Sequence, residues 1–233
     1  RETLSSSSPR AAMAETEIAV VERVGARGDG VARAGVRTAY VPFTVPGDRV
    51  RLARGARRGD GDAASLVEVL QPGPGRVAAR CPHFGACGGC ALQQWADDEV
   101  LAWKREQVVA ALAHRGLDAP VAAILATPPG ERRRVRLAAR NGRRGAALGY
   151  HVRASHAIVN VTDCPLLDPA LHTLLDGLRS LAAEVLGAGE EAAFEVTATA
   201  PGPDYVLERP RAPDAAEGRR LAAFAADAGL ARI

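Results

Sequence analysis

The most informative segment of this chain is a cysteine-rich loop, Cys81-Pro-His-Phe-Gly-Ala-Cys87-Gly-Gly-Cys90. It holds three of the four cysteines, and the fourth, Cys164, lies far downstream and is again followed by a proline. Four thiolates complete the ligand shell of a soft metal ion or of a cubane cluster. We therefore expect one inorganic group to tie the loop at residues 81–90 to the turn at Cys164.

Three kinds of chemistry are open to these cysteines. Disulfides are disfavoured because the chain is long, poor in cysteine and without a secretory signal. Structural zinc sites usually pair their ligands in two short hooks, whereas the ligands here divide three and one. Cubane iron–sulfur clusters often take three thiolates from one loop and the last from far away. Glycines at 85, 88 and 89 would let the loop wrap a bulky core, so a cluster is favoured over zinc and over inert thiols.

Length and composition set broad bounds. The chain has 233 residues, which is enough for one large domain or two smaller ones. No apolar run is long enough to span a bilayer, so we expect a soluble, cytoplasmic protein. The formal net charge is only +3, and Lys104 is the only lysine among 30 basic residues. Because arginine and alanine richness together indicate a nucleotide bias, the clustering of arginines is more informative than their number.

The two ends of the chain predict different things. The only methionine is Met13, and regular patterning begins at Glu17. Residues 1–13 are therefore expected to be a disordered extension. The other end stops at Ile233, just after a helical pattern closed by Gly229, and reads like the first residues of a strand cut short.

Residues 14–72 have the pattern of a small β-barrel. Strands are expected at 17–24, 37–43, 48–53 and 65–70, with glycine and proline turns between them. Several arginines bunch on the third of these strands and the turn after it, namely Arg49, Arg51, Arg54, Arg57 and Arg58. A solvated hairpin face and a phosphate-contacting edge are equally good interpretations of that group.

Residues 73–233 predict an α+β domain that includes the cysteine loop. Helices are expected at 97–115, 169–186 and 214–229, and strands at 132–140, 145–150, 156–161, 194–199 and 205–208. Asp168 and Pro169 suit the start of the second helix, which carries a strong leucine stripe. On the first helix, Leu101, Val108 and Leu112 are expected to form a buried face.

The strand at 132–140 is half-buried and basic in pattern. Apolar residues alternate with arginines, and Glu131 is the one acid nearby in the sequence. This local imbalance of charge is the best polyanion signal in the chain. The residues that we expect to contact the polyanion are Arg132, Arg133, Arg134, Arg136 and Arg140.

The cysteine loop, followed by Leu92-Gln93, resembles the RNA uracil-5-methyltransferases, which modify uridine in transfer RNA or large-subunit ribosomal RNA. The arginine strand, Leu148-Gly-Tyr150 and Asp163-Cys-Pro-Leu166 follow in the order found in that family. The N-terminal pattern, with Gly28-x-Gly30 and Tyr40-Val-Pro-x-x-Val-Pro-Gly47, is similar to a TRAM domain, a small RNA-binding barrel.

The resemblance implies a [4Fe–4S] cluster that is architectural and contacts RNA, held by Cys81, Cys87, Cys90 and Cys164. Family members continue into a Rossmann-like domain that binds S-adenosylmethionine and supplies a nucleophilic cysteine. No glycine-rich turn in a βαβ context is present here, and no cysteine is left over.

The fold class expected from the sequence is therefore α+β: an OB-like TRAM barrel, an iron–sulfur domain and no methyltransferase domain. Such a chain would be an N-terminal part of a transfer or ribosomal RNA methyltransferase. It would bind RNA but not S-adenosylmethionine, and without the catalytic domain it would be inactive alone. A stand-alone RNA-binding module and an electron-transfer iron–sulfur protein are the alternatives.

Overall fold

The computed structural model of the chain describes residues 15–35 and 37–231. The extension expected at residues 1–13 and the terminal Ile233 lie outside these ranges. The chain divides into two compact units. The first, called the barrel unit, comprises Arg1–Val77 and Gln94–Glu99, and the second, called the sheet unit, comprises Ala78–Gln93 and Val100–Ile233. Among the described helices, none is long and apolar enough to cross a membrane.

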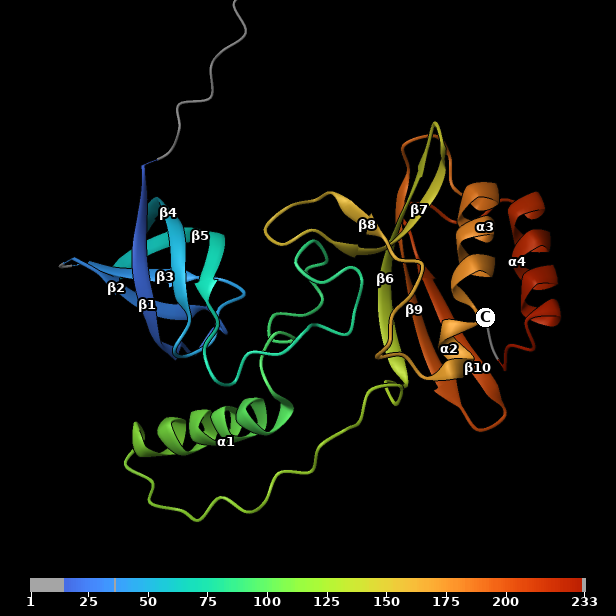
Figure 1. Cartoon of the computed structure of the whole chain (residues 1–233). Helices are drawn as coiled ribbons and strands as arrows, with labels where there is room; N and C mark the ends of the chain where they lie inside the picture. The colour runs from blue at the N-terminus through green and yellow to red at the C-terminus, as the bar shows by residue number, and fades with distance from the viewer. Residues whose placement is uncertain (1–14, 36, 232–233) are drawn as a thin grey trace, which may run out of the picture. The chain divides into compact units, whose positions relative to one another are not determined.

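Five strands close the barrel unit in the order β1-β2-β3-β5-β4 (Figure 1). They are β1 (Thr16–Val24), β2 (Gly30–Ala34), β3 (Arg37–Val41), β4 (Arg49–Arg58) and β5 (Gly61–Gln71). Only β3 and β5 pair in parallel. Alternate side chains fill the interior, among them Val21, Val41 and Leu52. The sequence predicts four of these strands. It does not predict β2, because the glycines that flank this strand are typical of turns.

A buried aspartate fixes the segment that leaves the barrel. Asp48 is fully buried and accepts hydrogen bonds from the backbone N–H groups of Val45 and Gly73, at 2.8 Å each. The Arg76 guanidinium binds the same carboxylate through two nitrogens, at 2.9 and 2.6 Å. Burial alone raises the pKa of Asp48, but these donors outweigh it and hold the pKa below its usual value.

Most of the arginines that bunch on β4 have acidic partners within the barrel unit. Arg51 pairs with Glu68, Arg54 with Glu17 and Asp62, and Arg58 with Asp29. Arg58 also lies over the Tyr40 ring, 5.6 Å from its centroid. Much of the basic charge on this hairpin is therefore neutralised locally.

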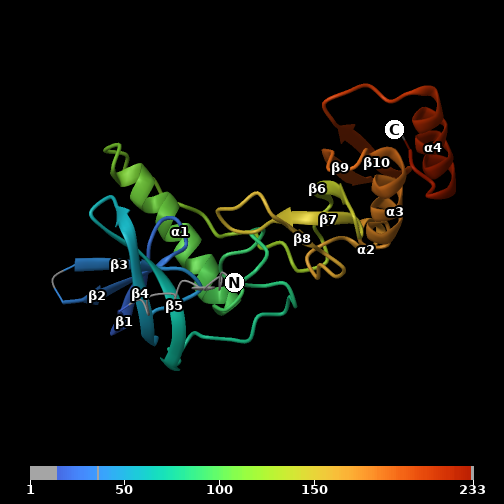
Figure 2. The same ribbon diagram turned by 90° about the horizontal axis from the view of Figure 1, so that it is seen from above.

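The sheet unit is a five-stranded antiparallel sheet with helices on one side (Figures 1 and 2). Its strands, in the order β10-β9-β6-β7-β8, are β6 (Arg134–Gly142), β7 (Gly145–His151), β8 (Ile158–Asn160), β9 (Glu191–Thr199) and β10 (Gly202–Glu208). The helices are α2 (Pro169–His172), α3 (Leu175–Val185) and α4 (Ala215–Asp227). Leu137, Leu148, Leu178 and Phe194 are fully or almost fully buried between the sheet and α3.

The helix expected at 169–186 is two helices in the structure. Asp168 caps α2 by accepting from the Ala170 N–H at 2.8 Å, as the sequence predicts. The first helix then ends at Thr173, whose hydroxyl donates to the carbonyl of Ala170 at 3.2 Å. Leu174 and the leucines after it continue the buried stripe into α3, so the apolar pattern spans the break.

Helix α1 (Asp97–Ala113) has the expected position but not the expected buried face. None of its residues is buried, and Val108 is 50% exposed. Leu101 and Leu112 are only partly covered. The prediction of a buried face was wrong because its apolar residues stand too sparsely, among alanines and charged side chains, to form a continuous stripe.

A network of ion pairs fastens α4 to the sheet. The Arg209 side chain is 3% exposed and contacts Glu190 at 2.9 Å and Glu217 at 3.3 Å. Arg211 pairs with the same two carboxylates. Glu217 and Asp214 also form the predicted capping box at the start of α4. One carboxylate thus serves both the helix terminus and the link to the strand end.

Acidification is expected to loosen α4 through Glu217. The hydrogen bond from Arg211, and then that from the Asp214 N–H, hold the pKa of Glu217 at about 2. Because this lies below the value of about 4.3 in an unfolded chain, the carboxylate stabilises the fold above that pH, and its contribution is lost as the pH falls from about 4.3 towards 2. Thermal melts across this window should show a weaker pH dependence in Glu217→Gln than in the wild type. Parallel curves would contradict this assignment.

Candidate functional site

Four cysteines from distant parts of the chain line one small apolar cavity of the sheet unit. Cys81, Cys87 and Cys90 come from the loop, and Cys164 from the turn before α2. All four are free thiols. The other lining residues are His83, Phe84, Gly89, Gln93, Arg132, Tyr150, Val161, Asp163 and Leu166. The structure therefore brings together the four residues that the sequence marks as one ligand set.

Backbone contacts hold the cysteine loop against the end of β7. The Gly88 N–H donates to the carbonyl of His151 at 2.9 Å, and Cys87 forms a β-bridge with Val152. A Cβ atom at Gly88 would lie 2.6 Å from that carbonyl, so only glycine fits. The Thr162 N–H donates to Nε2 of His83 at 3.3 Å. This last contact brings the loop to the segment that carries Cys164.

The cavity disfavours negative charge on the protein alone. Burial raises the pKa of the Cys87 thiol, and the neighbouring sulfurs of Cys90 and Cys81 raise it further. Burial likewise raises the pKa of Cys164, against the opposing charge of Arg132. The Gly89 N–H donates to Cys87 Sγ at 3.4 Å, and this hydrogen bond lowers the pKa of Cys87. Thiolates here need a compensating positive group, which bound metal ions supply.

The four cysteines share a cavity but do not form a ready-made site for a metal ion. Within residues 15–35 and 37–231, no three side chains of His, Cys, Asp or Glu lie close enough to hold one metal ion together. The four sulfurs nevertheless face the same cavity.

Among the described residues, none accepts a proton from either of two polar groups buried at this cavity, Nε2 of Gln93 and the hydroxyl of Tyr150, although Arg132 interacts with the Tyr150 oxygen. Leaving a buried polar group unpaired costs about 1–3 kcal/mol. Burial, followed by the charge of Cys164, raises the pKa of Tyr150 to about 12, so the hydroxyl keeps its proton. The sequence gives little sign that these two side chains have buried polar groups. Gln93 reads only as part of the loop motif, and Tyr150 only as part of the strand segment Leu148-Gly-Tyr150.

The five arginines expected to contact RNA do not form one patch. Arg134, Arg136 and Arg140 are exposed on the face of the sheet away from the helices. Arg133 donates instead to the carbonyl of Ala198 at 3.0 Å, and Arg132 lines the cysteine cavity.

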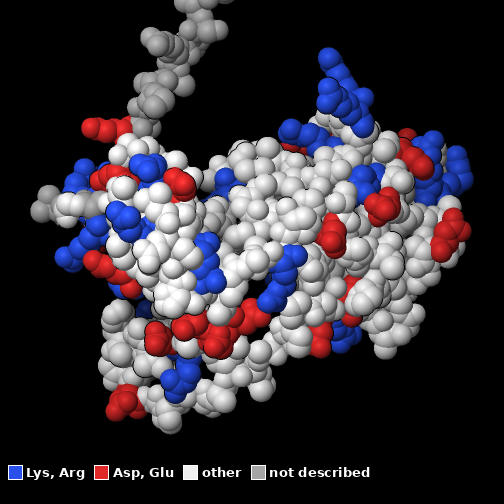
Figure 3. Space-filling model, viewed as in Figure 1, with Lys and Arg blue, Asp and Glu red and all other residues white. Residues whose placement is uncertain are grey.

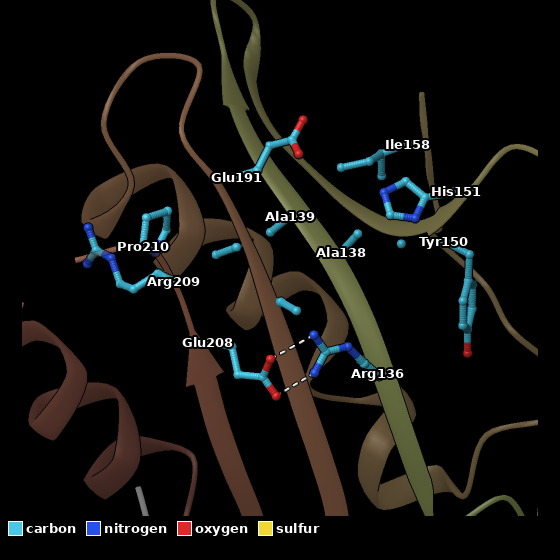
Figure 4. Close-up of a pocket in the computed structure, with 13 residues that line it drawn as sticks. Arg136, Ala138, Ala139, Tyr150, His151, Ile158, Glu191, Glu208, Arg209 and Pro210 are labelled. Carbon is cyan, nitrogen blue, oxygen red and sulfur yellow. Dashed lines mark hydrogen bonds and ion pairs between the residues drawn. The ribbon is translucent and has the colours of Figure 1, made fainter. Parts of the chain in front are cut away.

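Acidic residues from neighbouring strands accompany the arginines of β6. Arg134 pairs with Glu195, Arg140 with Glu191 and Arg136 with Glu208; Arg136 Nη2 lies 2.7 Å from Glu208 Oε2 (Figure 4). Glu131 is the one acid nearby in the sequence, but the folded sheet adds others. These acids are distant in sequence, and only the pairing of β9 with β6 and of β10 with β9 brings them alongside.

A shallow hollow of about 500 Å³ lies on this open face (Figure 4). Small residues, including Ala138, Gly149 and Ala193, line it together with the Arg136–Glu208 pair and His151. Basic side chains also gather at the end of the β6–β7 hairpin (Figure 3), where the turn contains Arg143 and Arg144. The face offers cationic groups beside a hollow that is lined in part by small side chains.

Comparison with known proteins identifies relatives of both units. Residues 18–74 match the TRAM domain of tRNA (uracil(54)-C(5))-methyltransferase. The chain is 42% identical over 221 residues to an uncharacterized RNA methyltransferase of Caulobacter vibrioides, covering 91% of this chain and 52% of the relative. It is 36% identical over 215 residues to the 23S rRNA (uracil(1939)-C(5))-methyltransferase of Halomonas elongata, and this match covers 91% of this chain and 44% of the relative.

A solved structure has the same fold over most of the chain. It is the Pyrococcus abyssi tRNA (uracil-54, C5)-methyltransferase in complex with S-adenosyl-L-homocysteine. The TM-score is 0.59 at 20% sequence identity, and the match covers 85% of this chain and 47% of that one.

These matches correct two expectations, namely that the methyltransferase domain is absent and that the chain is inactive. Most of the chain aligns with RNA methyltransferases and shares the fold of one of them. The chain spans about half the length of the curated relatives it matches. The absence of a glycine-rich turn and of a spare cysteine therefore applies only to the half of the relatives' length that this chain spans. Neither absence is evidence that the protein is inactive.

The chain carries a TRAM domain at residues 18–74 and is, over most of its length, a homologue of the RNA uracil-5-methyltransferases.

Proposed function

We propose that this chain is part of an S-adenosylmethionine-dependent RNA uracil-5-methyltransferase that acts on large-subunit ribosomal RNA in the cytoplasm. The supporting observation is the 36% identity to the 23S rRNA enzyme of Halomonas elongata, which extends over 91% of the chain. The transfer RNA enzyme of known structure is only 20% identical. The barrel unit and the sheet unit would serve to bind and orient the RNA.

A methyl-transfer assay tests this function. The protein that contains this sequence, incubated with labelled S-adenosylmethionine and unmodified 23S rRNA, should form 5-methyluridine that is detected by nuclease digestion and mass spectrometry. Unmodified transfer RNA is the parallel substrate and should stay unlabelled. Methylation of transfer RNA alone would overturn the ribosomal assignment, and no methylation of either RNA would overturn the function.

We further propose that Cys81, Cys87, Cys90 and Cys164 hold a [4Fe–4S] cluster. A zinc ion keeps four ligands at about 2.3 Å, so its donors crowd around one point. In a cubane each cysteine binds a different iron, which sets the sulfurs farther apart. Three cysteines from one loop and a fourth from a distant turn, all lining one cavity, fit the second arrangement better than the paired hooks typical of zinc. When bound, the cluster would cross-link the loop to the turn before α2 and offset the thiolate charge.

The open face of the sheet is the proposed RNA-contacting surface of this unit. Arg134, Arg136 and Arg140 each keep N–H donors beyond those that their glutamate partners use, because a guanidinium has five. Phosphate oxygens can therefore bind alongside the carboxylates or replace them. The glutamates compete with RNA for the arginines, so their removal should strengthen binding.

A further inference from the structure

We propose that Gln93 and Tyr150 donate hydrogen bonds to sulfur atoms of the iron–sulfur cluster and thereby raise its reduction potential. Because such a role exists only if the cluster is present, it rests on the proposed function of the four cysteines. Both side chains line the cysteine cavity, and within residues 15–35 and 37–231 no acceptor pairs with the buried Nε2 of Gln93 or with the proton of the buried Tyr150 hydroxyl.

The orientation of the Gln93 amide follows from its one hydrogen bond. The backbone N–H of Cys81 donates to Oε1 of Gln93 at 3.1 Å. A backbone N–H can only donate, so the oxygen must face Cys81 and the NH₂ group must occupy the other branch. That NH₂ group is buried and unpaired. Gln93 thus positions the first ligand of the loop with one end and presents a donor with the other.

The Tyr150 hydroxyl interacts with the Arg132 guanidinium, which can only donate, so the hydroxyl keeps its own proton for another acceptor. The ring stands beside the loop, since a Cβ atom at Gly89 would lie 3.5 Å from the Tyr150 ring and 3.4 Å from Cys87 Sγ. The cysteine sulfurs line the same cavity and are the acceptors that we propose for this proton.

Hydrogen bonds to the sulfurs of a cluster stabilise its more negative, reduced state and so raise its potential. The Gly89 N–H bond to Cys87 is one such donor from the backbone. Gln93 and Tyr150 would add two from side chains, which unlike the backbone can be removed by substitution.

The test is a redox titration and a resonance Raman spectrum of the anaerobically purified protein. Tyr150→Phe removes the hydroxyl and keeps the ring, and Gln93→Glu keeps the acceptor for Cys81 while removing the donor. Each variant should retain the wild-type ratio of iron to protein, have a more negative midpoint potential, and shift its Fe–S stretching bands. The double variant should show the larger displacement.

Tyr205→Phe is the matched control. The Tyr205 hydroxyl is also buried without a partner, but its ring packs against Phe194 and Phe224 in the core rather than at the cysteines. The midpoint potential and the resonance Raman spectrum of Tyr205→Phe should equal those of the wild type. Unchanged potentials in both Tyr150→Phe and Gln93→Glu would overturn the role, as would a loss of iron from either with an intact fold. Absence of iron from the wild type would instead overturn the proposed cluster.

Discussion

Replacement of Cys164 by serine is expected to remove the iron and to destabilise the sheet unit. Cys164 is the one proposed ligand outside the loop, and it is buried within the core of that unit. Without it the loop at residues 81–90 keeps its hydrogen bonds to His151 and Thr162 but loses the proposed covalent link to the turn before α2. Iron analysis should fall from about four atoms per chain to near zero. The thermal midpoint of the sheet unit should fall by about 10 °C, which corresponds to about 3 kcal/mol for a domain of this size.

Val161→Ala separates the loss of a ligand from the loss of packing. Val161 is buried and lines the same cavity but has no ligand atom. Its truncation should cost about 1–3 kcal/mol while the iron content stays at the wild-type level. Iron retained in full by Cys164→Ser would remove Cys164 from the ligand set and with it the three-plus-one interpretation of the sequence.

The second large effect is expected on RNA binding. Arg134→Ala combined with Arg136→Ala removes two guanidinium groups from the open face of the sheet. Each lost phosphate contact lowers the slope of log affinity against log salt by about 0.9 for duplexes and about 0.7 for single strands. The double variant should therefore bind ribosomal RNA at least about ten-fold more weakly at low salt. Filter binding at several salt concentrations measures both quantities.

Two variants control for general changes of charge. Arg219→Ala with Arg220→Ala removes the same charge from exposed positions on α4, away from the open face, and should leave RNA affinity unchanged. Glu208→Gln releases Arg136 from its partner and should strengthen binding. Equal losses in the β6 and α4 double variants would mean that net charge, rather than the arginine strand, attracts the RNA.

Local features of this fold could be predicted from the sequence because their causes are local. The capping residues Asp168 and Asp214, the leucine stripe of α3 and the alternation of β6 depend on neighbours within a few positions. The position of Cys164 beside the loop cysteines could also be predicted. The chain has four cysteines in all, and four thiolates complete the ligand shell of one metal centre.

The features that escaped prediction depend on contacts between distant segments. Glu195 and Glu208 lie far from the arginines in sequence, and only strand pairing shows that they neutralise part of the patch. The buried donors of Gln93 and Tyr150 become visible only when the loop closes over β7. The buried face expected on α1 was a different kind of error, because its few apolar residues are too widely spaced to form a continuous stripe.

The most direct test of the account is a metal analysis of the wild-type protein purified without oxygen, with iron, acid-labile sulfide and zinc measured on one sample. The four-cysteine cavity predicts about four iron and about four sulfide per chain, with no stoichiometric zinc. About one zinc per chain without iron, or no metal at all, would contradict the cluster.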